Sequence, residues 1–137
     1  MRASQTFQQT AALGSEEHSA CGFVIESTNS AVYFAGDTGY GEHFGEIAQR
    51  FSIDVALLPV GAYKPYEWFK DTHLNPETAV RAFTALKAKM LVPIHWGTFK
   101  ISDEPLGEPA VLLQEKARHL ALTERVRVLN NGESFRW

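Results

Sequence analysis

Two almost uninterrupted apolar runs constrain the fold of this chain most strongly. They are IDVALLPVG at residues 53–61 and MLVPIHW at residues 90–96. Each has the length of a strand and neither alternates with polar residues, which is typical of strands buried on both faces. Between them, residues 75–89 begin with helix-start signals, because Asn75 suits the N-cap and Pro76 the first helical position. This strand–helix–strand unit predicts a layered α/β domain.

The remaining segments extend the pattern to the order β-β-α-β-α-β-α-β. Residues 21–27 and 31–36 are apolar runs separated by the turn-forming sequence STNS, and they predict a hairpin. Apolar periodicity predicts two more helices and a last strand, at residues 41–51, 107–122 and 125–130 respectively. Residues 1–20 are polar and weakly patterned, so we expect an incoming loop there. We therefore expect residues 1–137 to form a single partial domain.

Composition narrows the function classes. The 13 basic and 16 acidic residues give a net charge of −3, which does not support nucleic-acid binding or a polybasic membrane anchor. The single cysteine, Cys21, cannot form an intrachain disulfide, which fits a reducing compartment. No apolar run approaches the roughly 20 residues of a membrane span, and the N-terminus lacks a signal-peptide core. We expect a cytoplasmic protein with no nucleic-acid partner and no transmembrane segment.

The sequence YFAGDTGYGEHF places Asp37 between glycines directly after an apolar strand. This aspartate could belong to an aspartic protease, could bind metal at the end of a strand, or could only form a tight turn. Aspartic proteases are essentially all-β, and their signature needs Ser or Thr where this chain has Tyr40. A haloacid-dehalogenase-type phosphotransferase needs a second aspartate at the position of Gly39. The metal-binding and turn interpretations remain open.

Two histidines occupy positions comparable to that of Asp37. His73 directly precedes the predicted helix at residues 75–89, and His95 ends the second apolar run. Since α/β folds gather functional groups at the ends of strands, these three side chains are predicted to cluster. One carboxylate and two imidazoles suit a zinc-type site, or acid–base chemistry with His73 as the proton carrier. Taken singly, each residue also has a purely structural interpretation, as a turn aspartate or as a packed histidine.

Four motifs together identify a family resemblance. They are VYFAGDTGYGEHF, LLPVGAYKPYEWF, THLNPETAV and VPIHWGTF. Their order and separations resemble those of metallo-β-lactamase-fold hydrolases. The resemblance is greatest to the branch with N-acylphosphatidylethanolamine-hydrolysing phospholipase D and the bacterial RomA-like proteins, and more distant to the ascorbate-6-phosphate lactonases. It runs from Cys21 to Ser134. It implies the second half of an αββα sandwich.

The resemblance implies roles for the clustered residues. Asp37 matches the aspartate that bridges two zinc ions, and His95 matches a histidine ligand of the second ion. His73 matches an active-site histidine near the scissile phosphate, so it is the expected catalytic residue. The implied reaction is hydrolysis of a phosphodiester, with a phospholipid or another phosphoester as substrate.

The sequence also departs from the family pattern. The principal metal motif, His-x-His-x-Asp-His, is absent from these 137 residues. A further histidine ligand is expected before the hairpin, where Gln9 occupies the position, and His18 is the alternative. We therefore expect the chain alone to bind metal weakly and to hydrolyse little. It would need the missing N-terminal half as a partner, or would be a non-catalytic unit, or would self-associate through an uncovered sheet face.

The aromatic segment between the second and third motifs has two interpretations. Its side chains could pack under their own loop, or could form an apolar rim that contacts the substrate; they are Tyr63, Tyr66, Trp68 and Phe69. The histidines outside the predicted cluster have a plainer interpretation. His43 and His119 lie on predicted helices among polar neighbours, so we expect both to be exposed to solvent.

Overall fold

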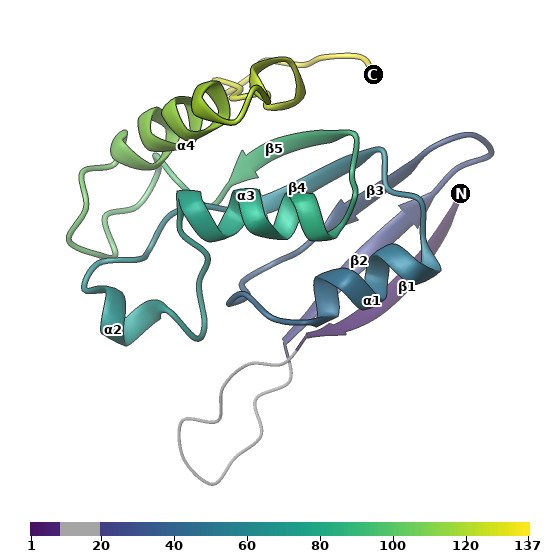
Figure 1. The fold of residues 1–137 in the computed structure, drawn as a ribbon, viewed down its shortest axis with the longest axis horizontal. Helices are drawn as coiled ribbons and strands as arrows, with labels where there is room; N and C mark the ends of the chain where they lie inside the picture. The colour runs from purple at the N-terminus through teal and green to yellow at the C-terminus, as the bar shows by residue number, and fades with distance from the viewer. Residues whose placement is uncertain (9–19) are drawn as a thin grey trace, which may run out of the picture.

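The computed structural model describes residues 1–8 and 20–137 and contains one five-stranded sheet (Figure 1). The strands lie in chain order: β1 (Arg2–Gln8), β2 (Ala20–Glu26), β3 (Ala31–Phe34), β4 (Val55–Pro59) and β5 (Met90–Ile94). The pairs β1–β2 and β2–β3 are antiparallel, whereas β3–β4 and β4–β5 are parallel. The predicted hairpin and both predicted buried strands are confirmed.

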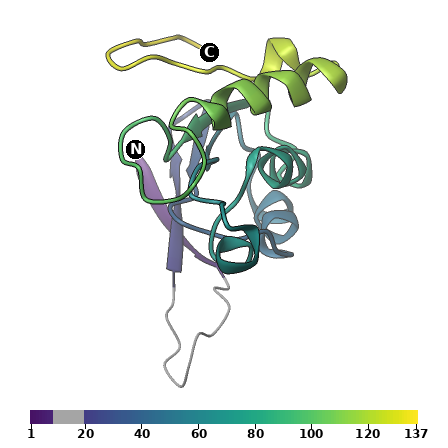
Figure 2. The same cartoon turned by 90° about the vertical axis from the view of Figure 1, so that its left-hand side faces the viewer.

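Among the described residues, three helices connect the parallel strands and a fourth follows β5. They are α1 (His43–Arg50), α2 (Tyr66–Phe69), α3 (Pro76–Ala85) and α4 (Glu108–His119), followed by the 3₁₀ turn η1 (Thr123–Arg125). The helices α1 and α3 lie against one face of the sheet, and α4 packs beside α3 beyond the β5 edge (Figures 1 and 2). The predicted α/β class is confirmed. In the described part of the chain no helix is long and apolar enough to cross a membrane.

Two sequence-based expectations about the ends of the chain are wrong. Residues 2–8, expected in a loop, form β1, whose backbone pairs with β2 from Arg2 opposite Glu26 to Gln8 opposite Ala20. Residues 125–130, expected to form a strand, pair only through the isolated bridge between Val126 and Leu91. The strand β1 lies at the edge of the sheet and is rich in polar residues, so a search for apolar runs does not find it. In the second segment only Val126 is buried, so alternation alone does not hold the segment to the sheet.

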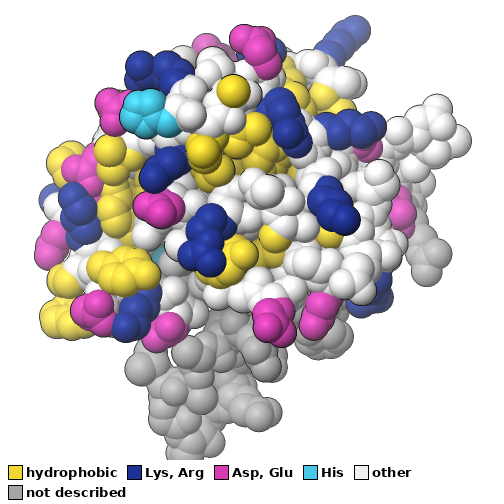
Figure 3. All heavy atoms as spheres, in the orientation of Figure 1, with side chains coloured by type: hydrophobic (Ala, Val, Ile, Leu, Met, Phe, Trp, Pro, Cys, Tyr) yellow, Lys and Arg dark blue, Asp and Glu magenta, His cyan; other side chains and the backbone are white. Residues whose placement is uncertain are grey.

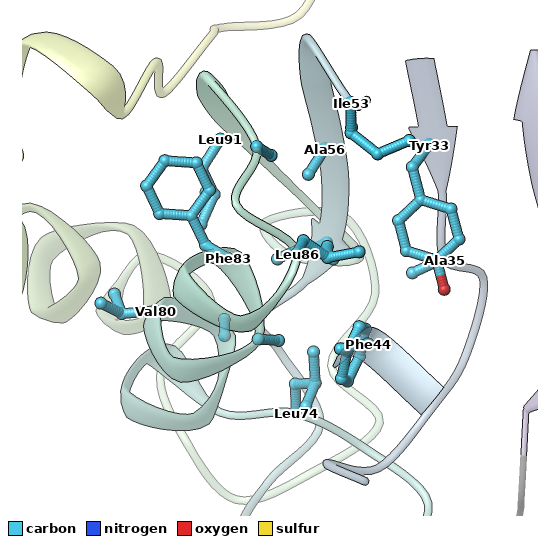
Figure 4. Packing of buried hydrophobic residues seen from close by; sticks show 14 of the residues in the cluster. Tyr33, Ala35, Phe44, Ile53, Ala56, Leu74, Val80, Phe83, Leu86 and Leu91 are labelled. Atoms are coloured by element: carbon cyan, nitrogen blue, oxygen red, sulfur yellow. The ribbon is translucent and has the colours of Figure 1, made fainter. Parts of the chain in front are cut away.

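The hydrophobic core lies between the sheet and the helices. Tyr33 of β3 is fully buried and meets the ring of Phe44 of α1 edge-on, with ring centroids 6.4 Å apart. Figure 4 shows Phe83 and Leu86 pointing from the α3 region toward the sheet. Because side chains alternate along a strand, the side chains next to Tyr33 in β3 point to the opposite face of the sheet.

That opposite face carries no helix of the described chain (Figure 2). Three large apolar side chains on it remain partly exposed: Phe23, Ile25 and Phe34 at 40%, 38% and 39%. Phe23 lies opposite Phe34 in the β2–β3 register, so the exposed rings form one patch. The helix-bearing face differs, because acidic and basic side chains are interspersed over it with no single-sign field (Figure 3).

Asp54 fastens the beginnings of three strands. Its Oδ2 atom accepts a hydrogen bond from the backbone N–H of Ala31 at 2.8 Å, and its Oδ1 atom pairs with Lys89 Nζ at 2.7 Å. Its backbone oxygen accepts from the N–H of Met90 at 2.8 Å. Asp54 therefore fixes the positions of the first residues of β3 and β5 relative to β4.

Glu104 fastens the opposite ends of β4 and β5. Its buried carboxylate accepts hydrogen bonds from the backbone N–H groups of Ala62 and Lys64 at 2.7 and 3.0 Å, and from the Ser102 hydroxyl at 2.7 Å. Tyr63 N–H adds a longer contact of 3.3 Å. Burial by itself would raise the pKa of this carboxyl, but the hydrogen bonds together hold it below the ordinary value. The loop after β4 is thus tied to the loop after β5.

We predict that Glu104→Gln lowers the free energy of unfolding at pH 7 by about 1–3 kcal/mol, because an amide leaves part of this donor set unpaired. The folded-state pKa of Glu104 is depressed, so its stabilisation is fully present above the ordinary value of 4.5 and is lost as pH falls through the lower value. The difference between the wild type and the variant should therefore shrink below about pH 4.

Urea unfolding across this pH range measures the effect. The control is Glu115→Gln on the exposed side of α4, which should change stability by less than about 0.5 kcal/mol. A Glu104→Gln variant as stable as the wild type at pH 7 would contradict the role of this carboxylate.

Candidate metal centre

The candidate site lies where the three parallel strands end. Asp37 stands in the loop after β3, His95 directly follows β5, and His73 stands between α2 and α3 in the connection after β4. Parallel strands place their carboxyl ends at the same edge of a sheet, which brings these loops together. The start of α3 is fixed by a capping box, in which Asn75 accepts from the N–H of Thr78 at 2.9 Å and Thr78 accepts from the N–H of Asn75 at 2.8 Å. This cap lies two residues after His73.

Two glycines allow the loops to approach closely. A β-carbon on Gly39 would overlap the backbone carbonyl of Asp71, and a β-carbon on Gly61 would overlap the carbonyl of His95. The first contact joins the Asp37 loop to the His73 loop, and the second joins the β4 loop to His95. Only glycine permits such backbone contacts.

The three predicted residues meet in one cluster. Each of Asp37, His73 and His95 offers one ligand atom, and these atoms lie within 4.8 Å of one another. The Oδ1 atom of Asp37 is 3.4 Å from Nε2 of His95, and the rings of His73 and His95 have centroids 5.4 Å apart. The side chain of Asp37 is 63% exposed and that of His95 is 28% exposed. The cluster is therefore open to solvent on the aspartate side.

This donor set fits a metal ion. Two atoms bound to tetrahedral zinc at 2.0–2.1 Å lie about 3.4 Å apart, which is the separation of Asp37 Oδ1 from His95 Nε2. The same separation is long for a hydrogen bond. Among the described residues, His95 Nδ1 is a buried polar atom without a hydrogen-bond partner. The backbone of His95 has φ of +58°, a sparsely populated conformation for a non-glycine residue.

The imidazole of His73 has a pKa shifted by its surroundings. Burial lowers its pKa, with a further lowering from His95, against opposing contributions from the carboxylates of Asp37 and Glu104. Its Nδ1 atom is 3.0 Å from the hydroxyl of Thr72, and its ring meets that of Phe69 edge-on at 5.5 Å. The pKa of the ring therefore lies below its ordinary value, and the ring is held on two sides.

His43 does not lie where the sequence suggested. It was expected to be solvated, but its side chain is buried under the Asp37 loop. Its Nε2 atom is 3.4 Å from the hydroxyl of the fully buried Thr38, and burial lowers its pKa. His43 therefore supports the residue after Asp37, and the only hint in the sequence is its nearness to that motif. His119 is exposed, as expected.

The four aromatic residues proposed as a rim divide into two groups. Tyr63 is buried, and its hydroxyl donates to Glu108 Oε1 at 2.7 Å, so it supports the loop from inside. Tyr66 and Trp68 are 50% and 76% exposed. Phe69 is half-buried against His73. The structure thus leaves three of the four side chains near the loop surface.

A cavity that the sequence did not indicate lies beside His95. Its volume is about 270 Å³, and it is enclosed mainly by residues 95–102 and 104–106, with Gly61, Ala62 and Pro109. None of the four rim residues lines it. Apolar periodicity could not reveal this cavity, because its walls are irregular loops.

The position of the additional predicted ligand stays open. Gln9, which occupies the expected ligand position, and its alternative His18 both lie outside the described residues.

Comparison with known proteins shows the family to which this chain is related. A family model described as the beta-lactamase superfamily domain matches residues 2–96, which is more than half of the chain.

Several curated proteins share this sequence region. An uncharacterised protein of Mycobacterium tuberculosis is 49% identical over 85 residues, covering 59% of this chain and 22% of its own length. An N-acyl-phosphatidylethanolamine-hydrolyzing phospholipase D of Caenorhabditis elegans is 35% identical over 97 residues, with coverages of 69% and 27%. A metal-dependent hydrolase of Caldivirga maquilingensis is 34% identical over 125 residues, with coverages of 90% and 50%. The chain thus spans half or less of these relatives.

Solved structures agree with this relationship. The metallo hydrolase Igni18 from Ignicoccus hospitalis superposes with a TM-score of 0.70 at 27% identity, covering 96% of this chain and 50% of that one. An isothiocyanate hydrolase from Delia radicum gut bacteria has a TM-score of 0.77 at 21% identity, with coverages of 98% and 53%, and shows the shared fold. The domain match and the common architecture show that this chain belongs to the beta-lactamase superfamily and has the metallo-β-lactamase fold.

Proposed function

We propose that this chain supplies part of a zinc-dependent hydrolase site that cleaves phosphodiesters. The observation that carries the proposal is the 3.4 Å approach of Asp37 Oδ1 to His95 Nε2, with His73 in the same cluster. The reaction class is supported by the relatives, of which one is a phospholipase D and another a metal-dependent hydrolase.

Asp37 and His95 would hold the metal. His95 would present one imidazole nitrogen, and Asp37 would present a carboxylate oxygen beside it. Zinc bound there would supply Lewis acidity and lower the pKa of water toward neutrality. The exposed side of Asp37 leaves room for the phosphoryl group.

His73 would act on the substrate. Because burial keeps its pKa below the ordinary value, the neutral ring can accept a proton at pH 7. The Thr72 hydroxyl occupies the Nδ1 side, which leaves Nε2 to contact a phosphoryl oxygen or to pass a proton to the leaving group. Phe69 holds the ring edge-on and limits its rotation.

A non-catalytic unit that keeps the fold but not the chemistry is the second candidate, and the ligand count favours it. A catalytic zinc takes about three protein ligands, whereas the described residues offer two once His73 serves the substrate. The relatives extend well beyond the region that this chain covers. Under the first candidate, by contrast, the remaining ligands would come from outside the described residues.

Hydrolysis of bis(p-nitrophenyl) phosphate separates the two candidates. We expect the chain with zinc alone to be nearly inactive, and activity to appear after addition of the preceding segment of a relative, expressed separately. That activity should disappear in His95→Ala and fall about 10²–10⁴-fold in His73→Ala. If mixing yields no His95-dependent activity, the chain is the non-catalytic unit.

Zinc titration of the chain tests which residues are ligands. His95→Ala should weaken zinc binding by at least about a hundredfold, since even partners of a ligand contribute 10–100-fold. His73→Ala should change zinc affinity by less than about threefold if that imidazole serves the substrate. His119→Ala, on the exposed side of α4, is the matched control and should bind like the wild type. Equal zinc affinity in His95→Ala and His119→Ala would exclude the proposed centre.

The contact at Gly39 gives a test of the loop geometry. Gly39→Ala should displace the Asp37 loop from the carbonyl of Asp71, lowering the free energy of unfolding by about 1–3 kcal/mol and zinc affinity by about tenfold. Gly45→Ala in α1 is the control, because a β-carbon there meets nothing within 4 Å and stabilises a helix by about 0.5–1 kcal/mol. Urea unfolding and zinc titration measure both variants. Unchanged zinc affinity in Gly39→Ala would contradict the role of this contact.

A further inference from the structure

The cavity beside His95 is formed by two loops that Glu104 holds together. One wall consists of Gly61 and Ala62 after β4, and the other of the loop after β5, up to Pro109 at the start of α4. His95 belongs to both the cavity wall and the metal-binding cluster. A group bound in the cavity would therefore be continuous with a group bound at the cluster.

Most polar side-chain atoms of the wall are already engaged, and one that has no partner in the described part of the chain, His95 Nδ1, is itself buried. The Glu104 carboxylate accepts from backbone N–H groups and from Ser102. The Lys100 ammonium donates to the backbone carbonyls of Ser102 and Asp103 at 3.1 and 3.3 Å, and the Trp96 indole donates to the carbonyl of Pro93 at 3.2 Å. A polar ligand group would find few free partners among these atoms.

The apolar side chains of the wall are, in contrast, unusually exposed. Phe99, Ile101 and Leu106 are 79%, 58% and 40% exposed. Their burial against an apolar ligand would be favourable at about 25 cal/mol per Å². The cavity volume of about 270 Å³ is nearly twice the roughly 150 Å³ of a cavity that holds benzene, so there is room for up to about ten carbon atoms.

We propose that this cavity binds an apolar group, of up to about ten carbon atoms, of the substrate whose hydrolysable bond lies at Asp37, His73 and His95. The proposal rests on the proposed function for the position of that bond. It assigns apolar selectivity to the loop after β5 and not to the aromatic segment at residues 63–69, none of whose four candidate residues lines the cavity.

Binding of straight-chain alcohols to the metal-free chain tests the cavity independently of zinc. In an NMR titration with ethanol, butanol, hexanol and octanol, affinity should rise by up to about fourfold per added CH₂, the equivalent of about 0.8 kcal/mol. The shifted resonances should lie in residues 96–106. An affinity that does not depend on chain length, or shifts confined to residues 63–69, would overturn the proposal.

Exposed side chains provide variants that leave the core intact. The double variant Phe99→Ser with Leu106→Ser should weaken octanol binding by at least tenfold, and the single variant Ile101→Ser should weaken it several-fold. The control Trp68→Ser, at a side chain that is 76% exposed on the aromatic segment, should bind octanol like the wild type. Loss of binding in Trp68→Ser with no loss in the double variant would reject the assignment to the loop after β5.

The two proposals fail separately. Asp37→Asn should lose zinc and keep octanol, because Asp37 does not line the cavity, whereas the double variant should keep zinc and lose octanol. Zinc binding without octanol binding in the wild type would overturn the cavity assignment and leave the proposed function standing. Octanol binding by a chain that gains no His95-dependent phosphodiesterase activity on mixing with the preceding segment of a relative would overturn the proposed function and leave the cavity assignment standing.

Discussion

The parallel pairing of β3, β4 and β5 is the constraint on which the candidate site depends, because it makes all three strands end at one edge of the sheet. The loops that leave this edge carry the residues of the cluster. Pairing alone brings loops near one another but does not bring side chains within ligand distance. The backbone contacts at Gly39 and Gly61 provide that closer approach. Secondary structure thus sets the position of the site, and two missing β-carbons set its dimensions.

Part of this arrangement was predictable from the sequence, because buried strands and helix caps have local sequence signals and α/β folds gather functional residues at the ends of strands. The buried strands, the start of α3 at Asn75 and the meeting of the three cluster residues followed from apolar runs and capping signals. The burial of His43 and the clamp at Glu104 did not, because they depend on loops that meet only in three dimensions. Glu104 contacts backbone groups about 40 residues earlier in the chain, and no periodic pattern records such a contact.

Two residues at the site have backbone conformations that non-glycine residues rarely adopt. Ala62 and His95 have φ of +62° and +58°, and both stand in loops that Glu104 or Gly61 holds in place. Such conformations cost of order 1–3 kcal/mol each and persist only when their surroundings determine them. The buried carboxylate and the tight backbone contact provide those surroundings. The irregular geometry is therefore maintained by neighbouring loops more than by the strands themselves.

The two carboxylates that fasten β4 stand at opposite ends of that strand, Asp54 before it and Glu104 against the loop after it. Five strand residues separate these ends by on the order of 15 Å, which exceeds the range over which substitutions usually influence one another. The effects of substitutions around Asp54 on the free energy of unfolding should therefore be additive with those of substitutions around the cluster. The edge at Asp54 is therefore one where stability can be engineered without changing the selectivity that the opposite edge sets.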